Sequence, residues 1–586
     1  MFKNISAFAN SFIEKVNKIN YLIPGVALLL IYFIVPLPFY NYSIGDGDIS
    51  EYLNNPLRII NGDLPYCDFW LSFPPGEVYL PALIYKIFGL NINYVLVFSI
   101  LISALIGFFL YILGKIIFRE NWLALISSLL VFFNGLPFHY SGHAYNHLFF
   151  LFLIISAIYF IRALLKIQPN VSLWREIKRE ENKKIEVLEV PINHDFFLLL
   201  FLAGIFNGLA FFFRFYETLA FFFALVLVIF LDCNSKKKTF FISLKSILCF
   251  SSGTLLVLGI GSLFFIDIIQ KMFNEVILGS ILHGTSLNRF YFTNSITLWN
   301  KIFTDFEILF ESGNYKMVLI IFYHFIHLLN VSLASILPFI VSAIVIWYLA
   351  GKKLIETNKS LIFFFFFWGI FSFPKALGRS DMSHLAPSIT PLFFLVIYFL
   401  QTYFRCADKN KNTMDNLVKR CLLIITFILL SPVPLFFAKS GYSLLKTPYK
   451  VSTAHGTLLF HNKPEADDVN NLIQFINKNS DEKDYIFVTP WFSPPLYALT
   501  NRKNPTYYDS MVDLISQPSI QKQNEVCNSL LNKSTKMIIH YPDWGFDGKK
   551  ELQFLYACPV LQKCIENNFN LKKKFGNYWV YLAKNK

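Results

Sequence analysis

Long apolar runs, separated by short polar breaks, dominate the first three quarters of the chain, from Tyr21 to Ala438. Many of these runs approach or exceed the roughly 20 residues that an α-helix needs to cross the hydrocarbon core of a bilayer. The pattern predicts an α-helical polytopic membrane protein with about eleven spans. Three lysines precede the first run, and no small-residue cleavage site follows it. We therefore expect a retained signal anchor, with the N-terminus in the cytoplasm and the C-terminus outside.

The composition supports a membrane protein and argues against one that binds nucleic acid. Of 586 residues, 55% are hydrophobic, 67 are Phe and only 15% are charged. A single soluble core could not hide that much apolar surface. The net charge is +14, from 52 Lys and Arg against 38 Asp and Glu. In a membrane protein this excess is typical of cytoplasmic loops facing anionic lipid, and no basic face interleaved with aromatic residues indicates DNA or RNA binding.

Two segments determine how spans are counted between residues 268 and 350. Residues 268 to about 315 are mixed and polar, which predicts a long outer loop. The apolar stretch from Tyr315 to Ala350 is long enough for two spans, but two spans would place the basic segment Gly351-Lys352-Lys353 outside. We expect one crossing together with a helix that lies on or dips into the outer face, because basic loops are retained in the cytoplasm.

The composition changes at Lys439, and no spanning run follows. Residues 1–438 are therefore predicted to form a transmembrane domain with a first outer loop at 41–90, and residues 439–586 a small extracytoplasmic α/β domain. Within this tail the pattern predicts one helix and three short buried strands. These elements are a helix at 466–480 and strands at 484–490, 535–542 and 577–583. A disulfide among Cys527, Cys558 and Cys564 fits an outer location, but the spacing does not specify the pairing.

The polar segment 45–89, directly after the first apolar run, is rich in acids. They are Asp46, Asp48, Glu51, Asp63, Asp68 and Glu77. Carboxylates are costly in lipid, so they mark either a water-facing surface or a functional site. One explanation is structural: Asp46 or Asp48 caps a helix that follows, and Asp63 and Asp68 occupy turns. The alternative is catalysis, and the order of the neighbouring residues favours it.

That order is an Asp, a helix, the sequence G-x-L-P-Y-x-D-F, a P-P pair and a membrane run that ends in F-G. The matching residues are Asp48, Gly62, Asp63, Leu64, Pro65, Tyr66, Asp68, Phe69, Pro74, Pro75, Phe88 and Gly89. This segment resembles the first outer loop of GT-C glycosyltransferases, which include protein O-mannosyltransferases and lipid A aminoarabinose transferase. Many relatives carry an acid pair at the first position. Here Ile49 follows Asp48, so the choice between Asp46 and Asp48 stays open, although the spacing to Gly62 favours Asp48.

The resemblance implies a bacterial GT-C-like fold and a glycosyltransferase, hexosyl or pentosyl, that uses a sugar linked to polyprenyl phosphate. An acceptor hydroxyl attacks the anomeric carbon, and lipid phosphate leaves. The hydroxyl loses its proton as the new bond forms, so a positioned carboxylate is needed as general base. Asp48, with Asp46 as the alternative, is the predicted base. The acceptor would be a glycan, lipid or protein of the cell envelope, at the outer face of a bacterial inner membrane.

The leaving phosphate needs cations or N–H donors, and the outer loops supply several. The residues predicted to bind the donor phosphate are Arg379, His384, Lys375 and Arg214. Loops of this kind are also commonly solvated turns with interfacial anchors. The residues predicted to contact substrate are Glu51, Tyr66, Asp68 and Asn146.

A metal site has weaker support in the sequence. His139, His143 and His147 have a spacing that could bind zinc on one helix, but Pro137 and Gly142 interrupt it. The sequence assigns no cofactor and leaves a divalent cation open. A transporter or flippase for lipid-linked sugar is the first rival function, and it should show internal repeats that are not seen. A polymerase or ligase of envelope polysaccharide is the second, and the sequence discriminates it poorly.

Overall fold

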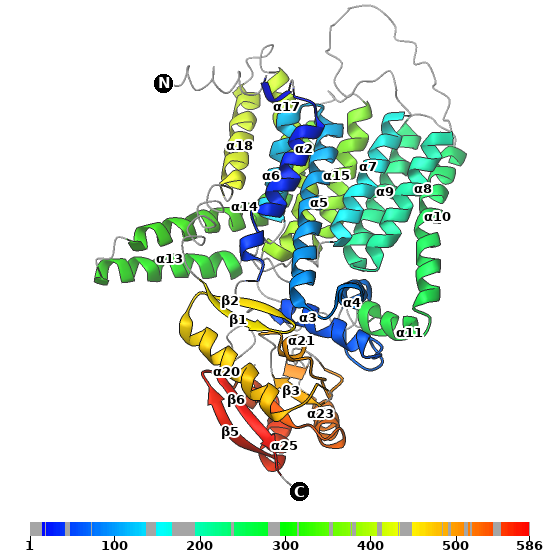
Figure 1. Ribbon diagram of the computed structural model, residues 1–586. Helices are drawn as coiled ribbons and strands as arrows, with labels where there is room; N and C mark the ends of the chain where they lie inside the picture. Colours follow the sequence, from blue (N-terminus) through cyan, green and yellow to red (C-terminus); the bar gives the residue numbers. More distant parts are fainter. Residues whose placement is uncertain are drawn as a thin grey trace, which may run out of the picture.

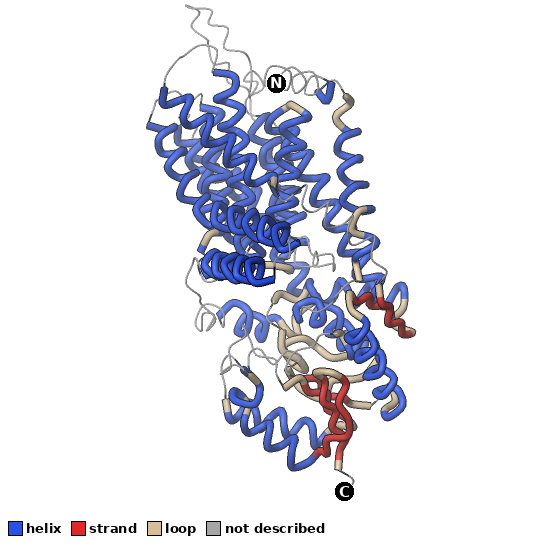
Figure 2. The backbone as a smooth tube through the Cα atoms, turned by 90° about the vertical axis from the view of Figure 1, so that its left-hand side faces the viewer, coloured by secondary structure: helices blue, strands red, loops and turns tan. Residues whose placement is uncertain are grey.

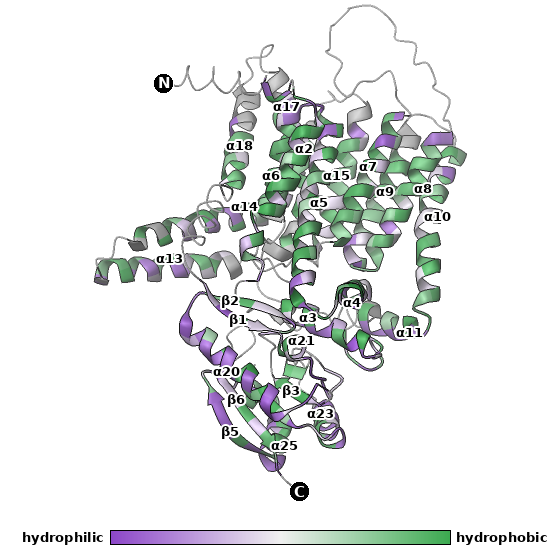
Figure 3. Cartoon of the chain, viewed as in Figure 1, coloured by the Kyte–Doolittle hydropathy of each residue, from purple (hydrophilic) through white to green (hydrophobic). Residues whose placement is uncertain are grey.

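The computed structural model describes most of the chain in a series of segments. These are residues 15–17, 19–41, 47–71, 73–135, 148–166, 194–235, 240–278, 293–312, 316–350, 356–374, 377, 382–406, 413–431, 433, 448–482, 484–489, 494–508, 514–515, 519–542 and 553–584. Figure 1 shows an elongated molecule with a large helical bundle at one end and a smaller domain containing strands at the other. The hydropathy colouring of Figure 3 separates them, because the bundle is largely apolar and the smaller domain is mixed.

Six helices in the described part of the chain are long and apolar enough to cross a membrane, judged by length and composition. They are α2 (Leu22–Ile34, continued by η1, Leu37–Phe39), α5 (Ile92–Phe118), α7 (Leu148–Lys166), α8 (His194–Phe211), α10 (Phe240–Phe264) and α14 (Lys316–Ala350). Shorter apolar stretches lie in α6 (Asn121–Gly135), α9 (Phe215–Ser235), α15 (Glu356–Ser372), α17 (Met382–Cys406) and α18 (Thr413–Leu430). The chain is a multipass membrane protein, and the number of spans stays a prediction.

Aromatic side chains fill the interior of the bundle. Trp368 of α15 is almost completely buried, and its ring meets that of Phe221 of α9 edge-on, with centroids 4.9 Å apart. Other large apolar side chains point outward, such as Phe264, which is 81% exposed, and Phe427, which is 77% exposed. A helix that is apolar on both its inner and outer faces is expected where lipid replaces water around the bundle.

The two ends of the bundle differ in what they contact. At one end, where α5 begins, the backbone N–H of Ile92 donates to the carbonyl of His455 in the C-terminal domain at 2.9 Å. At the other end, where α5 finishes, the Phe118 carbonyl accepts from the Gln401 side chain at 3.3 Å. Gln401 lies near the end of α17, so α17 begins on the side of the C-terminal domain. We call this side of the bundle, visible at the bottom of Figure 1, the tail face.

Helices α13 (Thr293–Ser312) and α14 form an antiparallel pair that runs crosswise to the rest of the bundle in Figures 1 and 2. The Asp305 carboxylate contacts Nδ1 of His324 at 2.5 Å between them. The segment expected to be a loop over 268 to about 315 is helical at 293–312, where apolar residues at helical spacing pack against α14. Its outer location stays a prediction. The helix α14 is continuous, so 315–350 does not divide into a crossing and a separate surface helix.

The C-terminal domain is built from a hairpin and a four-stranded sheet. The hairpin pairs β1 (Tyr449–Thr453) with β2 (Gly456–Phe460), and the sheet has the order β3-β4-β6-β5. Strands β3 (Ile486–Thr489) and β4 (Met537–His540) are parallel, whereas β6 (Tyr578–Ala583) runs antiparallel to β4 and to β5 (Phe569–Phe575). The helices of the domain are α20 (Lys463–Asn479), α21 (Leu496–Thr500), α23 (Ile520–Asn532), α24 (Phe554–Ala557) and α25 (Pro559–Asn568). The predicted α/β character, the helix at α20 and the strands β3, β4 and β6 are confirmed.

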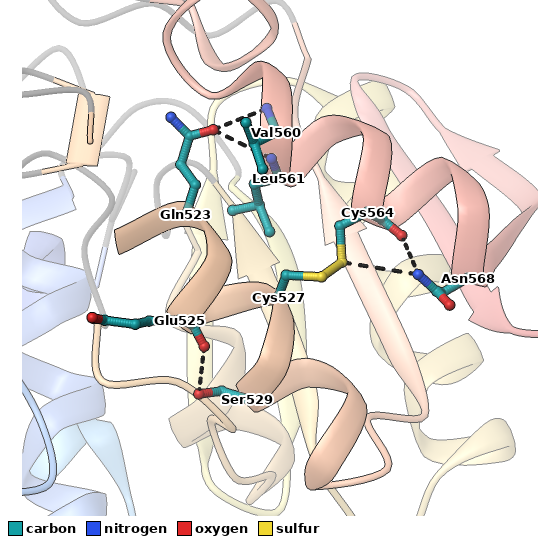
Figure 4. Close-up of a disulfide and its surroundings, with 8 residues drawn as sticks. All are labelled: Gln523, Glu525, Cys527, Ser529, Val560, Leu561, Cys564 and Asn568. Carbon is teal, nitrogen blue, oxygen red and sulfur yellow. Dashed lines mark hydrogen bonds between the residues drawn. A yellow bond between two sulfur atoms is a disulfide. The ribbon is translucent and has the colours of Figure 1, made fainter. Parts of the chain in front are cut away.

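A disulfide joins Cys527 of α23 to Cys564 of α25, across a Cα–Cα distance of 6.1 Å (Figure 4). The Gln523 side chain supports the same junction, since its amide oxygen accepts from the backbone N–H of Val560 at 3.0 Å. Cys558 is free and buried, and burial raises the pKa of its thiol to about 12. The structure thus selects one of the three pairings that the sequence left open.

Candidate active site at the tail face

The helix α3 (Gly47–Ile60) is the first element of the site. Its apolar residues Ile49, Leu53 and Leu57 recur every four positions and are buried in one cluster with residues of the C-terminal domain. This spacing places them on a single helix face. The helix is followed by Gly62, whose φ of +94° is a conformation that only glycine adopts without strain. Asp48 belongs to the first turn of α3, and its side chain lies outside the described residues, as does the whole of Asp46.

Arg58, in the last turn of α3, holds the loop that follows. It is 6% exposed, and its guanidinium donates in three directions. Nε contacts the Asp63 carboxylate at 2.8 Å, and Nη1 and Nη2 donate at 2.8 Å to the backbone carbonyls of Thr506 and Asp68. The same group lies over the ring of Phe69, 4.8 Å from its centroid. One buried cation therefore binds helix, loop and C-terminal domain together.

The turn from Leu64 to Phe69 explains several residues of the sequence motif. The Asp68 carboxylate accepts from the backbone N–H of Leu64 at 2.8 Å, as expected for an acid in a turn. Tyr66 has a φ of +62° and is buried, with its hydroxyl donating to the carbonyl of Phe73. These contacts hold the backbone of the loop. The predicted substrate contacts of Tyr66 and Asp68 stay predictions.

Tyr507 and Glu275, from two distant parts of the chain, pack against this loop and contact each other. Glu275 belongs to the π-helical turn η3 (Phe273–Leu278), which follows α11 (Ile269–Met272). The Tyr507 hydroxyl lies 2.8 Å from the Glu275 carboxylate and 3.2 Å from the carbonyl of Tyr66. Burial, followed by the neighbouring Glu275 charge, raises the pKa of Tyr507. The phenol therefore stays a proton donor at physiological pH.

A buried ion pair joins the next helix, α4 (Gly76–Phe88), to the bundle. Nε of Arg214 lies 3.1 Å from the carboxylate of Glu77, and the two side chains are 13% and 4% exposed. The Arg214 guanidinium also covers the ring of Phe73, 3.9 Å from its centroid. A methyl group on Gly76 would come within 2.6 Å of the Phe212 carbonyl, so only glycine fits where α4 meets the α8–α9 turn. Arg214 is thus at the tail face beside the loop.

The C-terminal domain is docked onto this loop by paired polar contacts. The Asn54 side-chain oxygen accepts from the backbone N–H of Ala498 at 3.0 Å. The backbone N–H of Trp70 donates to the Tyr507 carbonyl at 2.8 Å. Together with the buried cluster under α3, these bonds make the C-terminal domain part of the wall of the site.

The structure brings some predicted residues together and leaves others outside its described parts. Glu51, Tyr66, Asp68 and Arg214 lie at the tail face, and Glu51 accepts from the Asn55 side chain at 3.5 Å. The helix α17 that contains His384 begins on the same face, but the His384 side chain is not described. The predicted residues Arg379, Lys375 and Asn146 lie outside the described residues, as do His139, His143 and His147.

Sequence reasoning missed three residues that hold the site: Arg58, Glu275 and Tyr507. For Arg58 a signal was present, because its acidic partner Asp63 lies only five residues further along the chain, just past the end of α3. For Glu275 and Tyr507 no local pattern exists, since 232 residues separate them. In the described parts of the chain, no group of three or more His, Cys, Asp and Glu side chains could hold a metal ion.

Comparison with known proteins gives a fold and no closer relationship. No family model matches the sequence, and no curated protein matches it. Among solved structures, ArnT from Cupriavidus metallidurans bound to undecaprenyl phosphate matches with a TM-score of 0.50. The alignment covers 97% of this chain and 99% of ArnT, at 12% sequence identity. The chain has the GT-C fold.

Two further GT-C structures align over similar lengths. The archaeal oligosaccharyltransferase AglB from Archaeoglobus fulgidus, in complex with an inhibitory peptide and a dolichol-phosphate, gives a TM-score of 0.48 at 11% identity. The alignment covers 96% of this chain and 74% of AglB. ArnT in the apo state gives 0.46 at 11% identity, covering 97% of this chain and 99% of that chain. The match to ArnT bound to undecaprenyl phosphate confirms the expected GT-C-like fold, and the C-terminal region contains a sheet.

Proposed function

We propose that this protein is a glycosyltransferase that moves a sugar from a polyprenyl-phosphate donor to a cell-envelope acceptor. The observation that supports it most is the GT-C fold over nearly the whole chain, matched to an ArnT structure bound to undecaprenyl phosphate. Fold alone does not determine function. The second support is local. The helix α3, whose first turn contains Asp48, lies at the tail face, and buried contacts hold the backbone of the loop that follows it.

In the proposed reaction, the oxygen of an acceptor hydroxyl attacks the anomeric carbon of the donor sugar. The bond from that carbon to the phosphate oxygen breaks, and polyprenyl phosphate leaves with the bonding electrons. The hydroxyl proton passes to the carboxylate of Asp48, with Asp46 as the alternative base. A single displacement of this kind inverts the anomeric configuration. General-base catalysis contributes roughly 10² to 10⁴ to the rate of such reactions.

The departing phosphate is proposed to bind cations of the tail face. Arg214 is placed there with its guanidinium held between Glu77 and the Phe73 ring. Arg379, Lys375 and His384 precede or begin α17, whose N-terminus is on the same side. The partial positive charge of a helix N-terminus favours an anion. A phosphate near this end of α17 would therefore be stabilised both by these side chains and by the helix N-terminus.

The tail face is proposed to be the outer face of a bacterial inner membrane. Asn121 at the opposite end of the bundle donates to the carbonyl of Val16, which places the N-terminal segment on that side. Basic residues collect there, among them Lys115 and Arg119, and positive charge is typical of cytoplasmic ends. The Cys527–Cys564 disulfide points the same way, because disulfides persist in oxidising compartments. On this assignment residues 1–438 form the membrane domain and residues 439–586 the extracytoplasmic domain.

The function is tested with the purified full chain in lipid nanodiscs. A set of polyprenyl-phosphate hexoses and pentoses is incubated with cell-envelope acceptor extract, and transferred sugar is identified by mass spectrometry. We expect transfer from at least one monophosphate donor with inversion at the anomeric carbon. Movement of intact lipid-linked sugar across the bilayer without transfer would contradict the proposal, and so would transfer only from diphosphate-linked donors.

A further inference from the structure

A cleft lies between α3 and the C-terminal domain, beside the docking contacts described above. Its cavity volume is small, about 60 Å³, and it opens to solvent. One wall includes Asn54 and Arg58, which lie four residues apart on one side of α3, and Asn61, which directly follows the helix. The other wall comes from the C-terminal domain and includes Tyr485, Lys503 and Lys533. The cleft therefore exists only where the two parts of the chain meet.

Asn54 contributes a hydrogen-bond donor that no described residue of the chain accepts from. The residue is 3% exposed, and its Oδ1 accepts from the backbone N–H of Ala498 at 3.0 Å, which fixes how the amide is oriented. Its Nδ2 is buried and has no hydrogen-bond partner among the described residues. A buried donor left unsatisfied costs free energy comparable to a lost hydrogen bond. A ligand with acceptor oxygens in the cleft would remove that cost.

Four cationic side chains line the cleft: two of them bind other groups of the protein, and two form no ion pair with the described residues. Arg58 is bound to Asp63 and to backbone carbonyls, and Arg502 donates to Ser480 through Nε at 3.1 Å and is buried. Lys503 and Lys533 form no ion pair with the described residues. Nζ of Lys533 lies 5.4 Å from the centre of the Tyr485 ring. Because Asp63 is already paired, the unbalanced charge of the cleft is positive.

We propose that this cleft binds the acceptor, and that the acceptor is an anionic glycan. Lysines recognise its carboxylates or other acidic groups, while the Asn54 and Asn61 amides and the Tyr485 ring suit the hydroxyls and faces of sugar rings. Asn54 is six residues beyond Asp48, which is about 9 Å along the helix at 1.5 Å per residue. An acceptor bound in the cleft would thus lie along the helix whose first turn contains the proposed base. The statement that the bound glycan is the acceptor rests on the proposed function. The statement that the cleft binds an anionic glycan does not.

The test measures binding of defined oligosaccharides to the full chain in nanodiscs, with no donor present. Oligogalacturonate serves as the acidic probe, a maltooligosaccharide of the same length as the neutral probe, and oligoglutamate as an acidic probe that is not a sugar. Binding is measured by isothermal titration calorimetry for the wild type, Lys503→Glu, Lys533→Glu and Lys572→Glu. Lys572 is an exposed lysine of β5 that does not line the cleft, so its variant is a matched control.

We expect oligogalacturonate to bind and both other probes to bind at least tenfold more weakly. Each cleft reversal should weaken binding by about tenfold, since reversal both removes an attraction and adds a repulsion, and Lys572→Glu should leave it unchanged. Raising the salt from about 0.1 M to about 1 M should weaken binding, because it shortens the Debye length from about 10 Å to about 3 Å. Equal binding of the neutral sugar or of oligoglutamate would overturn the proposal, as would unchanged affinity in both cleft variants with unaltered melting temperatures.

The result can be separated from the fate of the proposed function. Asp48→Asn should bind oligogalacturonate like the wild type, because the base is not part of the cleft. If transfer occurs but the acidic probe does not bind, the acceptor assignment is wrong and the glycosyltransferase stands. If the probe binds in the predicted manner but no polyprenyl-phosphate sugar is ever transferred, the proposed function is wrong and the cleft stands as a glycan-binding site.

Discussion

The guanidinium of Arg58 lies 2.8 Å from the carboxylate of Asp63, in a pair whose cation is buried and whose anion is partly exposed. Arg58 also donates to the Asp68 carbonyl, in the same loop, and to the Thr506 carbonyl, 448 residues away. A single side chain thus fastens the loop behind the proposed catalytic helix to the C-terminal domain.

Replacing Arg58 with Ala should destabilise the protein by about 3 kcal/mol, because several charge-assisted hydrogen bonds are lost and carbonyls are left unsatisfied. Arg58→Lys keeps the charge but not the planar fork, so an intermediate loss is expected. Thermal unfolding of the purified protein measures both. A melting temperature of Arg58→Ala equal to that of the wild type would contradict the role given to this residue.

The packing of α8 on α10 depends on glycines where the two helices meet, and Gly253 is one of them. A methyl group on Gly253 would lie 2.2 Å from the Phe201 carbonyl oxygen, and that oxygen cannot move without the helix. Gly253→Ala should therefore cost about 1–3 kcal/mol, as overpacking does. Gly259→Ala, on the same helix with open space around it, is the matched control and should be neutral. Equal melting temperatures for the two variants would show that the helices do not meet as described.

His540 should make the C-terminal domain sensitive to acid. Burial lowers the pKa of this imidazole to about 4 from an ordinary value of 6.5, and its Nδ1 has no partner among the described residues. The folded state therefore binds fewer protons than the unfolded state between these values. Stability is fully present above pH 6.5 and is lost as the pH falls towards 4, by about 3 kcal/mol in all.

Unfolding followed by tryptophan fluorescence across this pH range measures that loss. His540→Gln cannot titrate, so the difference in melting temperature between wild type and variant should change over this window and level off below it. A difference that stays constant with pH would exclude His540 as the source.

The Cys527–Cys564 disulfide closes a long loop, because its two cysteines are 37 positions apart in sequence. Chain-entropy arguments give a cross-link of that length about 4 kcal/mol of stabilisation. Reductant should therefore lower the melting temperature of the wild type and have no such effect on Cys527→Ser/Cys564→Ser. In intact cells, maleimide labelling of these two cysteines should require prior reduction. Labelling of both cysteines without reductant would contradict the bond.

The sequence alone predicted the membrane bundle, the GT-C fold and a helix directly after Asp48, because each depends on local periodicity or on an ordered motif. The helix begins slightly earlier than predicted, since Asp48 belongs to its first turn. It also predicted β3, β4 and β6, which are short apolar runs. It did not predict β5, whose central residues are exposed lysines, or α13, whose apolar stripe is diluted by polar residues. The contacts of Arg58 with Thr506 and of Tyr507 with Glu275 join segments hundreds of residues apart, so no local pattern could reveal them.

The most direct test of the central claim is the rate of sugar transfer by Asp48→Asn compared with the wild type. The substitution keeps the size of the side chain and removes its ability to take a proton. We predict a fall in kcat/KM of about 10² to 10⁴, with oligogalacturonate binding unchanged. Asp467→Asn, an exposed acid on α20, should transfer at the wild-type rate. If Asp48→Asn transfers sugar as fast as the wild type, Asp48 is not the base; the same substitution at Asp46 would then be the variant that must lose activity.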